Sequence, residues 1–111
     1  MQRTPPHRVL FVCGHNRLRS PTAEHLFGDR ADLEVASAGL KHDAEQPLGA
    51  ELVEWAQLIF VMEKAQRAKL QQRFRAQLLG KRVVCLDIPD EYDYMDPALV
   101  RLLEAKVPRY L

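Results

Sequence analysis

A cysteine and an arginine stand in this chain in an arrangement that suits chemistry on an anion. An apolar run over residues 9–12 ends at Cys13, and Arg19 and Ser20 follow before Pro21 opens a helical pattern. A thiol between a strand and a helix N-terminus lies where backbone N–H groups and the helix dipole favour the thiolate. The same N–H groups can hold an oxyanion, and a guanidinium can bind two of its oxygens. The segment therefore predicts a nucleophile, an anion cradle and a clamp in one turn.

The alternative interpretation of Cys13 is a small buried hydrophobe at the end of a strand. A cysteine and an arginine at this spacing also occur together by chance. The context favours the functional interpretation, because Gly14 and Asn16 in the loop tolerate left-handed backbone and a Ser-Pro helix start follows.

These residues make the segment similar to the phosphate loop of the low-molecular-weight protein tyrosine phosphatases, where a cysteine, five residues and Arg-Ser-Pro stand near the start of the chain. The resemblance spans residues 8–107, and the chain is shorter than typical members, mainly between Gly39 and Leu58. It implies a cysteine-dependent phosphomonoesterase, in the first place a tyrosine phosphatase, acting on a phosphorylated protein or small phosphomonoester. The matching pieces are residues 13–21, Thr22-Ala23-Glu24, Ser37-Ala38-Gly39, Leu58 to Glu63 and Ile88 to Tyr92.

The resemblance also assigns roles within the loop. Cys13 attacks phosphorus to give a phosphocysteine, while the loop N–H groups and the Arg19 guanidinium stabilise the transferring group. Ser20 donates its hydroxyl to the sulfur; it is also a plausible helix N-cap, and both roles can hold together. Asn16 holds a left-handed turn and bonds to Ser37, which otherwise is a plain strand-end hydroxyl. The loop residues expected to bind substrate or phosphate are Gly14, His15, Asn16, Arg17, Leu18 and Ser20.

A leaving alkoxide or phenoxide needs a proton from a general acid. Asp90 is favoured, because it follows a proline and stands near Tyr92, as the family's acid does in Pro-Asp-Pro-Tyr; Glu91 replaces the second proline. Tyr92 and Tyr94 are the candidates for a wall against which an aryl phosphate stacks, and for either the alternative is a half-buried loop anchor. The competing acids are Asp87, which closes a strand, Asp93, and Asp96, which precedes Pro97 as a helix N-cap does.

Three loop positions depart from the family pattern. His15 stands where glycine is usual, and Leu18 replaces the second loop cysteine of many members. Arg17 adds a cation, which either favours a more acidic substrate or lies in solvent. No pair of metal ligands at suitable spacing accompanies His15, so we expect neither a metal nor another cofactor.

Composition and charge narrow the class of protein. The net charge of +1 gives no general attraction to nucleic acid or membrane. No apolar run approaches about 18 residues, and the N-terminus lacks the apolar centre of a signal peptide. Only Cys13 and Cys85 occur, and a thiolate site needs a reducing compartment, so we expect a cytoplasmic protein without a disulfide. The basic run, interpreted as a solvated helix face, is Lys64, Arg67, Lys69, Arg73, Arg75, Lys81 and Arg82.

Strand-like and helix-like patterns alternate, which predicts an α/β fold in three layers, a four-stranded parallel sheet with helices on both faces. Ligands of such sheets bind beyond the carboxyl ends of the strands, where Cys13 and Asp90 both stand. We expect one domain over residues 1–111, with a flexible tail over residues 1–7. The predicted strands are 9–12, 33–38, 58–62 and 82–86, and the helices begin at Pro21, Pro47, Glu63 (ending near Leu79, before Gly80) and Pro97.

Two other functions remain open. A thiol-dependent arsenate reductase uses a similar oxyanion loop but relays oxidation to two more cysteines, and only Cys85 exists besides Cys13. A non-catalytic phosphate-binding module would keep the cradle and lose turnover. The presence of Cys13, Arg19 and Ser20 together favours the phosphatase over both.

Overall fold

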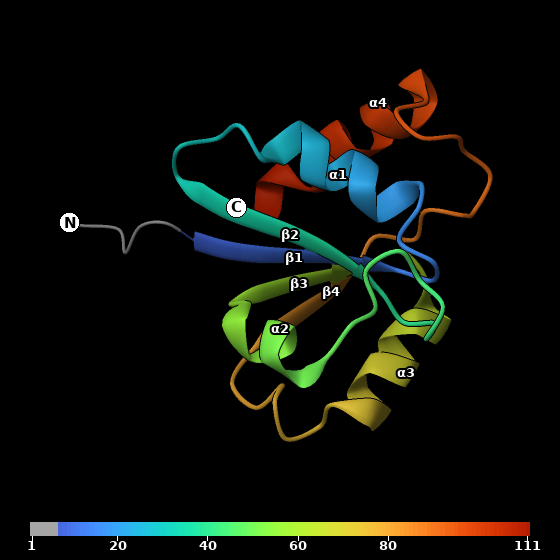
Figure 1. The fold of residues 1–111 in the computed structure, drawn as a ribbon. Coiled ribbons are helices and arrows are strands. Elements are labelled where there is room, and N and C mark those ends of the chain that lie inside the picture. Colours follow the sequence, from blue (N-terminus) through green and yellow to red (C-terminus); the bar gives the residue numbers. More distant parts are fainter. Residues whose placement is uncertain (1–6) are drawn as a thin grey trace.

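The computed structural model describes residues 7–111 and contains one parallel sheet of four strands in the order β2-β1-β3-β4 (Figure 1). The predicted sheet is therefore confirmed. β1 and β2 are longer than the apolar runs indicated, and they pair from His7 beside Leu33 to Cys13 beside Gly39. The strands are β1 (His7–Cys13), β2 (Leu33–Gly39), β3 (Leu58–Val61) and β4 (Arg82–Cys85).

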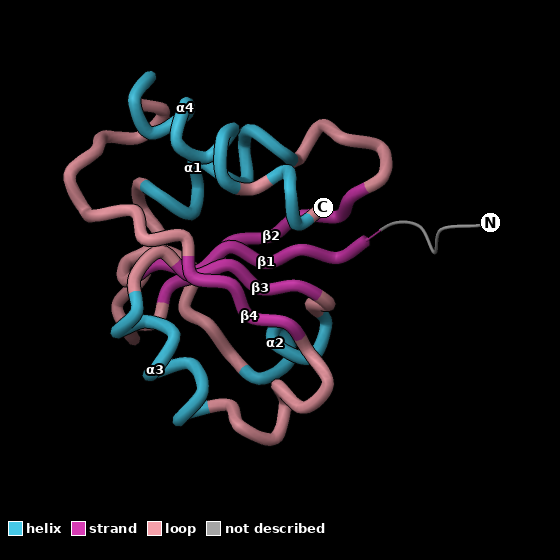
Figure 2. The backbone as a smooth tube through the Cα atoms, turned by 180° about the vertical axis from the view of Figure 1, so that it is seen from behind, coloured by secondary structure: helices cyan, strands magenta, loops and turns pink. Residues whose placement is uncertain are grey.

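Helices cover both faces of the sheet (Figure 2). One layer contains α1 (Arg19–Phe27) and α4 (Pro97–Lys106), and the other contains α2 (Ala50–Trp55) and α3 (Lys64–Arg73). A short 3-10 turn, η1 (Pro108–Tyr110), follows α4. The predicted three-layer α/β architecture is confirmed.

The core lies on both sides of β1, which explains its unbroken apolar run. On one side Phe11 stacks on Phe27 and Phe60, with ring centroids 5.9 and 5.1 Å away. On the other side Leu10 and Val12 belong to a second apolar cluster, which includes Leu70 of α3 and Phe74. Since residues 9–13 of β1 are all buried, the strand provides a fixed base for Cys13 at its end.

Three helix boundaries differ from those expected. α1 begins at Arg19, before Ser20, so the prediction that Ser20 caps this helix is wrong. Pro47 forms a parallel bridge to Gly39, and α2 begins only at Ala50. α3 ends at Arg73, because the next residue, Phe74, leaves helical geometry and buries its ring in the core.

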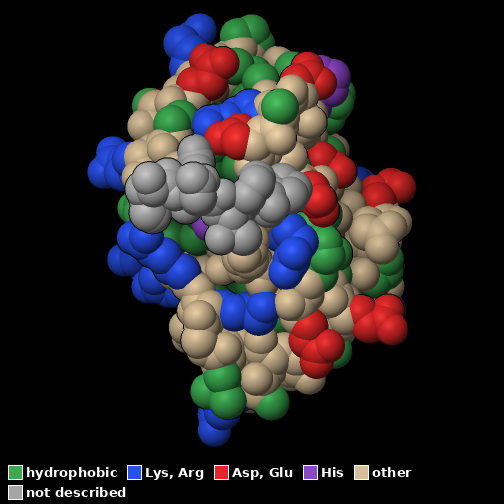
Figure 3. Space-filling model, turned by 90° about the vertical axis from the view of Figure 1, so that its left-hand side faces the viewer, with side chains coloured by type: hydrophobic (Ala, Val, Ile, Leu, Met, Phe, Trp, Pro, Cys, Tyr) green, Lys and Arg blue, Asp and Glu red, His purple; other side chains and the backbone are tan. Residues whose placement is uncertain are grey.

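The surface at the amino ends of the strands carries a mixture of charges. Figure 3 shows that Lys and Arg side chains and Asp and Glu side chains both occur on this face. Of the expected tail over residues 1–7, residues 1–6 lie outside the described residues, and His7 is the first residue of β1. Within residues 7–111, no helix is long and apolar enough to cross a membrane.

Candidate active site

A pocket of about 480 Å³ opens at the carboxyl edge of the sheet. The loop after β1 forms one side of it, and the segments that follow β2, β3 and β4 supply the rest. The pocket brings Cys13, Arg19 and Asp90 together, as the parallel topology requires. Its lining residues are Cys13, Gly14, His15, Arg17, Leu18, Arg19, Lys41, Glu63, Gln66 and Asp90.

The backbone of the loop is oriented by its neighbour, residues 40–45. The carbonyl oxygens of Cys13, Gly14 and His15 accept hydrogen bonds of 2.9–3.0 Å from N–H groups of that segment. Because a trans peptide places each N–H opposite the preceding carbonyl, the N–H groups of the next residues point away from residues 40–45. This orientation is the one that an anion cradle needs.

Asn16 fixes the turn within the loop. Its φ of 58° is left-handed, and its buried side-chain amide donates to Ser20 Oγ at 2.8 Å and to Ser37 Oγ at 3.0 Å. Ser37 in turn donates to a carboxylate oxygen of Glu24. The contact between Asn16 and Ser37 that the family resemblance implies is therefore present, and it ties the loop to β2.

Gly39 lets the loop approach β2 closely. A Cβ atom at this position would lie 2.5 Å from the carbonyl oxygen of Gly14 and 2.5 Å from the Cβ of Ala44. No side chain fits without moving backbone, so Gly39 is required by space and not by its φ.

Cys13 lines the pocket, and its sulfur lies beside Ser20. The two atoms, Sγ and Oγ, are 3.0 Å apart, and both residues are buried. Ser20 and Asn16 are not lining residues of the pocket; the Asn16 side chain turns away from it to Ser20 and supports the loop from within. The hydroxyl can donate to the Cys13 sulfur, which is the role expected from the resemblance.

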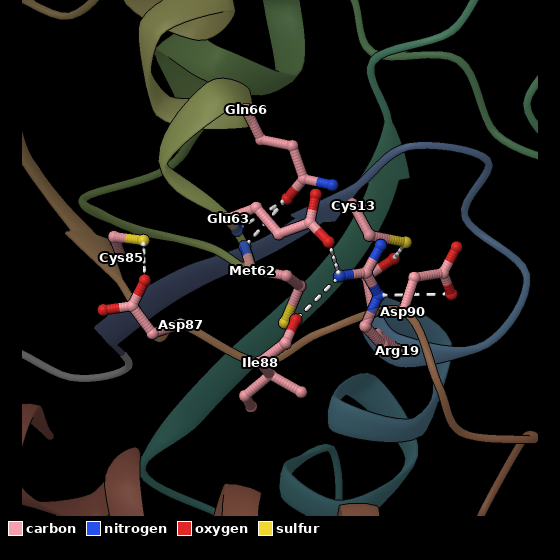
Figure 4. A network of polar contacts seen from close by, with 10 residues as sticks. Cys13, Arg19, Met62, Glu63, Gln66, Cys85, Asp87, Ile88 and Asp90 are labelled. Carbon is pink, nitrogen blue, oxygen red and sulfur yellow. Dashed lines mark hydrogen bonds and ion pairs between the residues drawn. The ribbon is translucent and has the colours of Figure 1, made fainter.

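Arg19 is held in place by acidic and carbonyl oxygens (Figure 4). Its Nη1 donates to Glu63 Oε2 at 2.9 Å and to the Ile88 carbonyl at 2.8 Å, and its Nε lies 3.7 Å from Asp90 Oδ1. Within the part of the chain that the structure describes, no contact engages Nη2, so its two N–H groups point to no other residue. The side chain is only 5% exposed, which fixes the direction of the guanidinium.

Glu63 is a site residue that the sequence reasoning missed. It forms a capping box with Gln66, whose Oε1 accepts from the N–H groups of Met62 and Glu63. This arrangement holds the Glu63 carboxylate against Arg19. The sequence does contain a signal for this arrangement, because Glu63 directly follows an apolar strand and stands three residues before Gln66, the spacing of a capping box.

The four candidate acids lie in different surroundings. Asp90 alone among them lines the pocket, and its carboxylate is 63% exposed. Asp87 lies beside Cys85, 3.6 Å from its sulfur, in a separate recess (Figure 4). Asp96 accepts from Ala98 N at 2.9 Å and caps α4, as its alternative interpretation predicts. Asp93 is exposed. Of the four, Asp90 is therefore the one whose carboxylate borders Arg19 in the pocket.

The remaining predicted residues lie around the rim. His15 is 3.8 Å from Asp43, a pair that is ionic only when the imidazole is protonated. Arg17 lies 3.4 Å from Glu45. Tyr92 packs, half-buried, against the core and is not a lining residue of the pocket. Its placement matches the loop-anchor interpretation more closely than an aryl wall.

The two cysteines are free and lie in different pockets. Cys85 contacts Asp87 and not the loop. Among residues 7–111, no group of three or more His, Cys, Asp or Glu side chains is placed to hold a metal ion.

This parallel α/β fold, with Cys13 and Arg19 at the two ends of one loop at the carboxyl edge of the sheet, defines the class of cysteine-dependent phosphatases. The family model for the low molecular weight phosphotyrosine protein phosphatases matches residues 8–77. The chain belongs to this family and is a phosphatase.

Solved structures share the fold. The tyrosine phosphatase Wzb of Escherichia coli K30, in complex with phosphate, is 22% identical with a TM-score of 0.73, covering 93% of this chain and 94% of that one. Vibrio vulnificus Wzb with benzylphosphonate is 24% identical with a TM-score of 0.69, covering 88% and 90%. The YwlE arginine phosphatase of Geobacillus stearothermophilus is 22% identical with a TM-score of 0.70, covering 95% of each chain. A comparison with curated proteins gives no match.

Proposed function

We propose that the protein hydrolyses phosphotyrosine in proteins through a phosphocysteine on Cys13. The observation that carries this proposal is the placement of Cys13 Sγ, 3.0 Å from Ser20 Oγ, in one pocket with a buried arginine and an aspartate. A nucleophile, an anion clamp and a proton donor are the groups that hydrolysis in two steps needs.

In the first step, the Cys13 thiolate attacks phosphorus and the bond to the ester oxygen breaks. The loop N–H groups and the free N–H groups of Arg19 Nη2 bind the three equatorial oxygens, where the charge is spread. Glu63 positions the guanidinium by its 2.9 Å contact to Nη1. Asp90 gives its proton to the departing phenolic oxygen.

In the second step, water attacks the phosphocysteine, Asp90 accepts its proton, and the sulfur leaves as thiolate. The Ser20 hydroxyl donates to that sulfur and makes it a better leaving group. Asn16 keeps Ser20 in position, because its amide donates to the same hydroxyl oxygen at 2.8 Å. Ser20 thus acts mainly on this step.

A phosphoryl group on tyrosine is the substrate that the family description indicates, whereas one solved structure of this fold is an arginine phosphatase. The arsenate reductase alternative loses support, because Cys85 lies in a different pocket from Cys13. The intact set of Cys13, Arg19 and Asp90 opposes a non-catalytic module. A cytoplasmic location fits a thiolate that must stay reduced.

The test is hydrolysis of nitrophenyl phosphate and of paired peptides that carry phosphotyrosine or phosphoarginine, with EDTA present throughout. We expect turnover of the nitrophenyl ester and the phosphotyrosine peptide, and none by the Cys13→Ser variant, whose hydroxyl is barely ionised at neutral pH. Circular dichroism of the variant controls for folding. Loss of turnover in EDTA, activity of the serine variant, or hydrolysis of the phosphoarginine peptide alone would contradict the proposal.

A further inference from the structure

A second pocket, of about 650 Å³, adjoins the first. The two are contiguous, since His15 and Lys41 line both. The second pocket extends from the rim of the phosphate loop across the segment after β2 to α3, which contributes Lys69 and Arg73. Those two α3 residues are four apart and therefore lie on one face of the helix.

The lining of the second pocket is strongly basic. Lys41, Lys69 and Arg73 are cationic, and His15 and His42 add imidazoles, whereas Asp43 is the single carboxylate. The chain as a whole carries a net charge of only +1. The lining of this pocket is thus more positive than the average of the chain.

The two lysines of the pocket are available to a ligand. Both are exposed, and within residues 7–111 neither is in an ion pair. Arg73 is fixed in the wall, because it donates to the Leu40 carbonyl at 2.7 Å and stacks on the Phe74 ring. Asp43 lies towards His15, at 3.8 Å. The carboxylate therefore faces the rim and not the lysine on α3.

We propose that this second pocket is an anion subsite that selects phosphopeptides with an acidic side chain close to the phosphorylated residue. The inference rests on the proposed function, since the phosphoryl group must occupy the first pocket. The shared residues His15 and Lys41 place the two anions side by side, and a peptide spans roughly 3.5 Å per residue. A glutamate or aspartate one to three residues away reaches the second pocket.

The test compares kcat/KM for two phosphotyrosine peptides that differ only in having glutamate or glutamine at the flanking positions. Nitrophenyl phosphate, which lacks a second anion, reports basal activity. The variant is Lys69→Glu, which changes a residue of the second pocket alone. The matched control is Arg75→Glu, because Arg75 is exposed, lines neither of the two pockets and gives the same change in net charge.

We expect wild type to prefer the glutamate peptide by about threefold to tenfold at low ionic strength, since each exposed ion pair contributes a factor of roughly 1.5 to 5. Lys69→Glu should abolish or reverse the preference with unchanged hydrolysis of nitrophenyl phosphate. Arg75→Glu should keep the preference for the glutamate peptide, and added salt should weaken that preference in the wild type. Equal rates for the two peptides in wild type, a preference that survives Lys69→Glu, or equal loss in Arg75→Glu would overturn the subsite alone. Absence of turnover with every ester would overturn the proposed function and the subsite with it.

Discussion

Substituting Asn16 by alanine removes the support of the phosphate loop at one point. Two buried hydrogen bonds are lost, to Ser20 at 2.8 Å and to Ser37 at 3.0 Å. Each bond contributes about 1 kcal/mol to the free energy of unfolding. No larger penalty for an unpaired hydroxyl is added, because Ser20 keeps its contact with Cys13 and Ser37 keeps its bond to Glu24. The φ of 58° adds roughly 1 kcal/mol of strain for alanine. The free energy of unfolding should fall by about 3 kcal/mol.

Urea denaturation of Asn16→Ala measures this loss, and a double-mutant cycle with Ser37→Ala isolates one of the two contacts. We expect a coupling energy of about 1 kcal/mol between Asn16 and Ser37. The denaturant slope should stay unchanged, because the same surface is exposed on unfolding. A loss below about 1 kcal/mol, or a coupling energy near zero, would refute the account of the loop as held by this amide.

Other variants test the clamp, the acid and the close approach to β2. Arg19→Lys replaces a planar fork by a point charge and should reduce kcat for nitrophenyl phosphate by about 10²-fold or more; near-normal kcat would exclude Arg19 as the clamp. Asp90→Asn should slow hydrolysis of phosphotyrosine by roughly 10²–10⁴-fold and that of the activated nitrophenyl ester less, whereas Asp96→Asn should change either rate little; exchanged phenotypes would make Asp96 the donor. Gly39→Ala should displace the loop and lower both kcat and the melting temperature. Wild-type values of both would show that the structure accommodates a Cβ atom at this position, against the requirement for glycine.

The strand and loop that carry Cys13 could be predicted because their determinants are local: an apolar run, a cysteine, glycine and asparagine in a turn, and a helix start. For Ser20, two roles were expected, a helix N-cap and a donor to the Cys13 sulfur, and the sequence did not separate them. Ser-Pro is typical of a helix N-cap, yet in the folded chain the hydroxyl lies between Cys13 and Asn16, and such a competition between partners is decided only by tertiary structure.

Contacts between distant segments explain the remaining misses. Glu63 meets Arg19 across 44 residues of sequence, so the sequence indicated its strand end but not its partner. Lys69 and Arg73 were part of a basic run interpreted as a solvated face, and their helical spacing did place them together. That this face borders the loop at His15 depends on how α3 packs on the sheet. Tyr92 was assigned from the resemblance, and its packing follows instead from the core it meets.

The most direct measurement is the identity of the residue that carries the phosphoryl group during turnover. Ser20→Ala should slow the second step and let the intermediate accumulate, so this variant is mixed with nitrophenyl phosphate, quenched in acid and digested for mass spectrometry. The account predicts the added mass of one phosphoryl group on Cys13, which disappears when Cys13 is also replaced by serine. Turnover with no phosphoryl group on Cys13, or with the group on another residue, would contradict it.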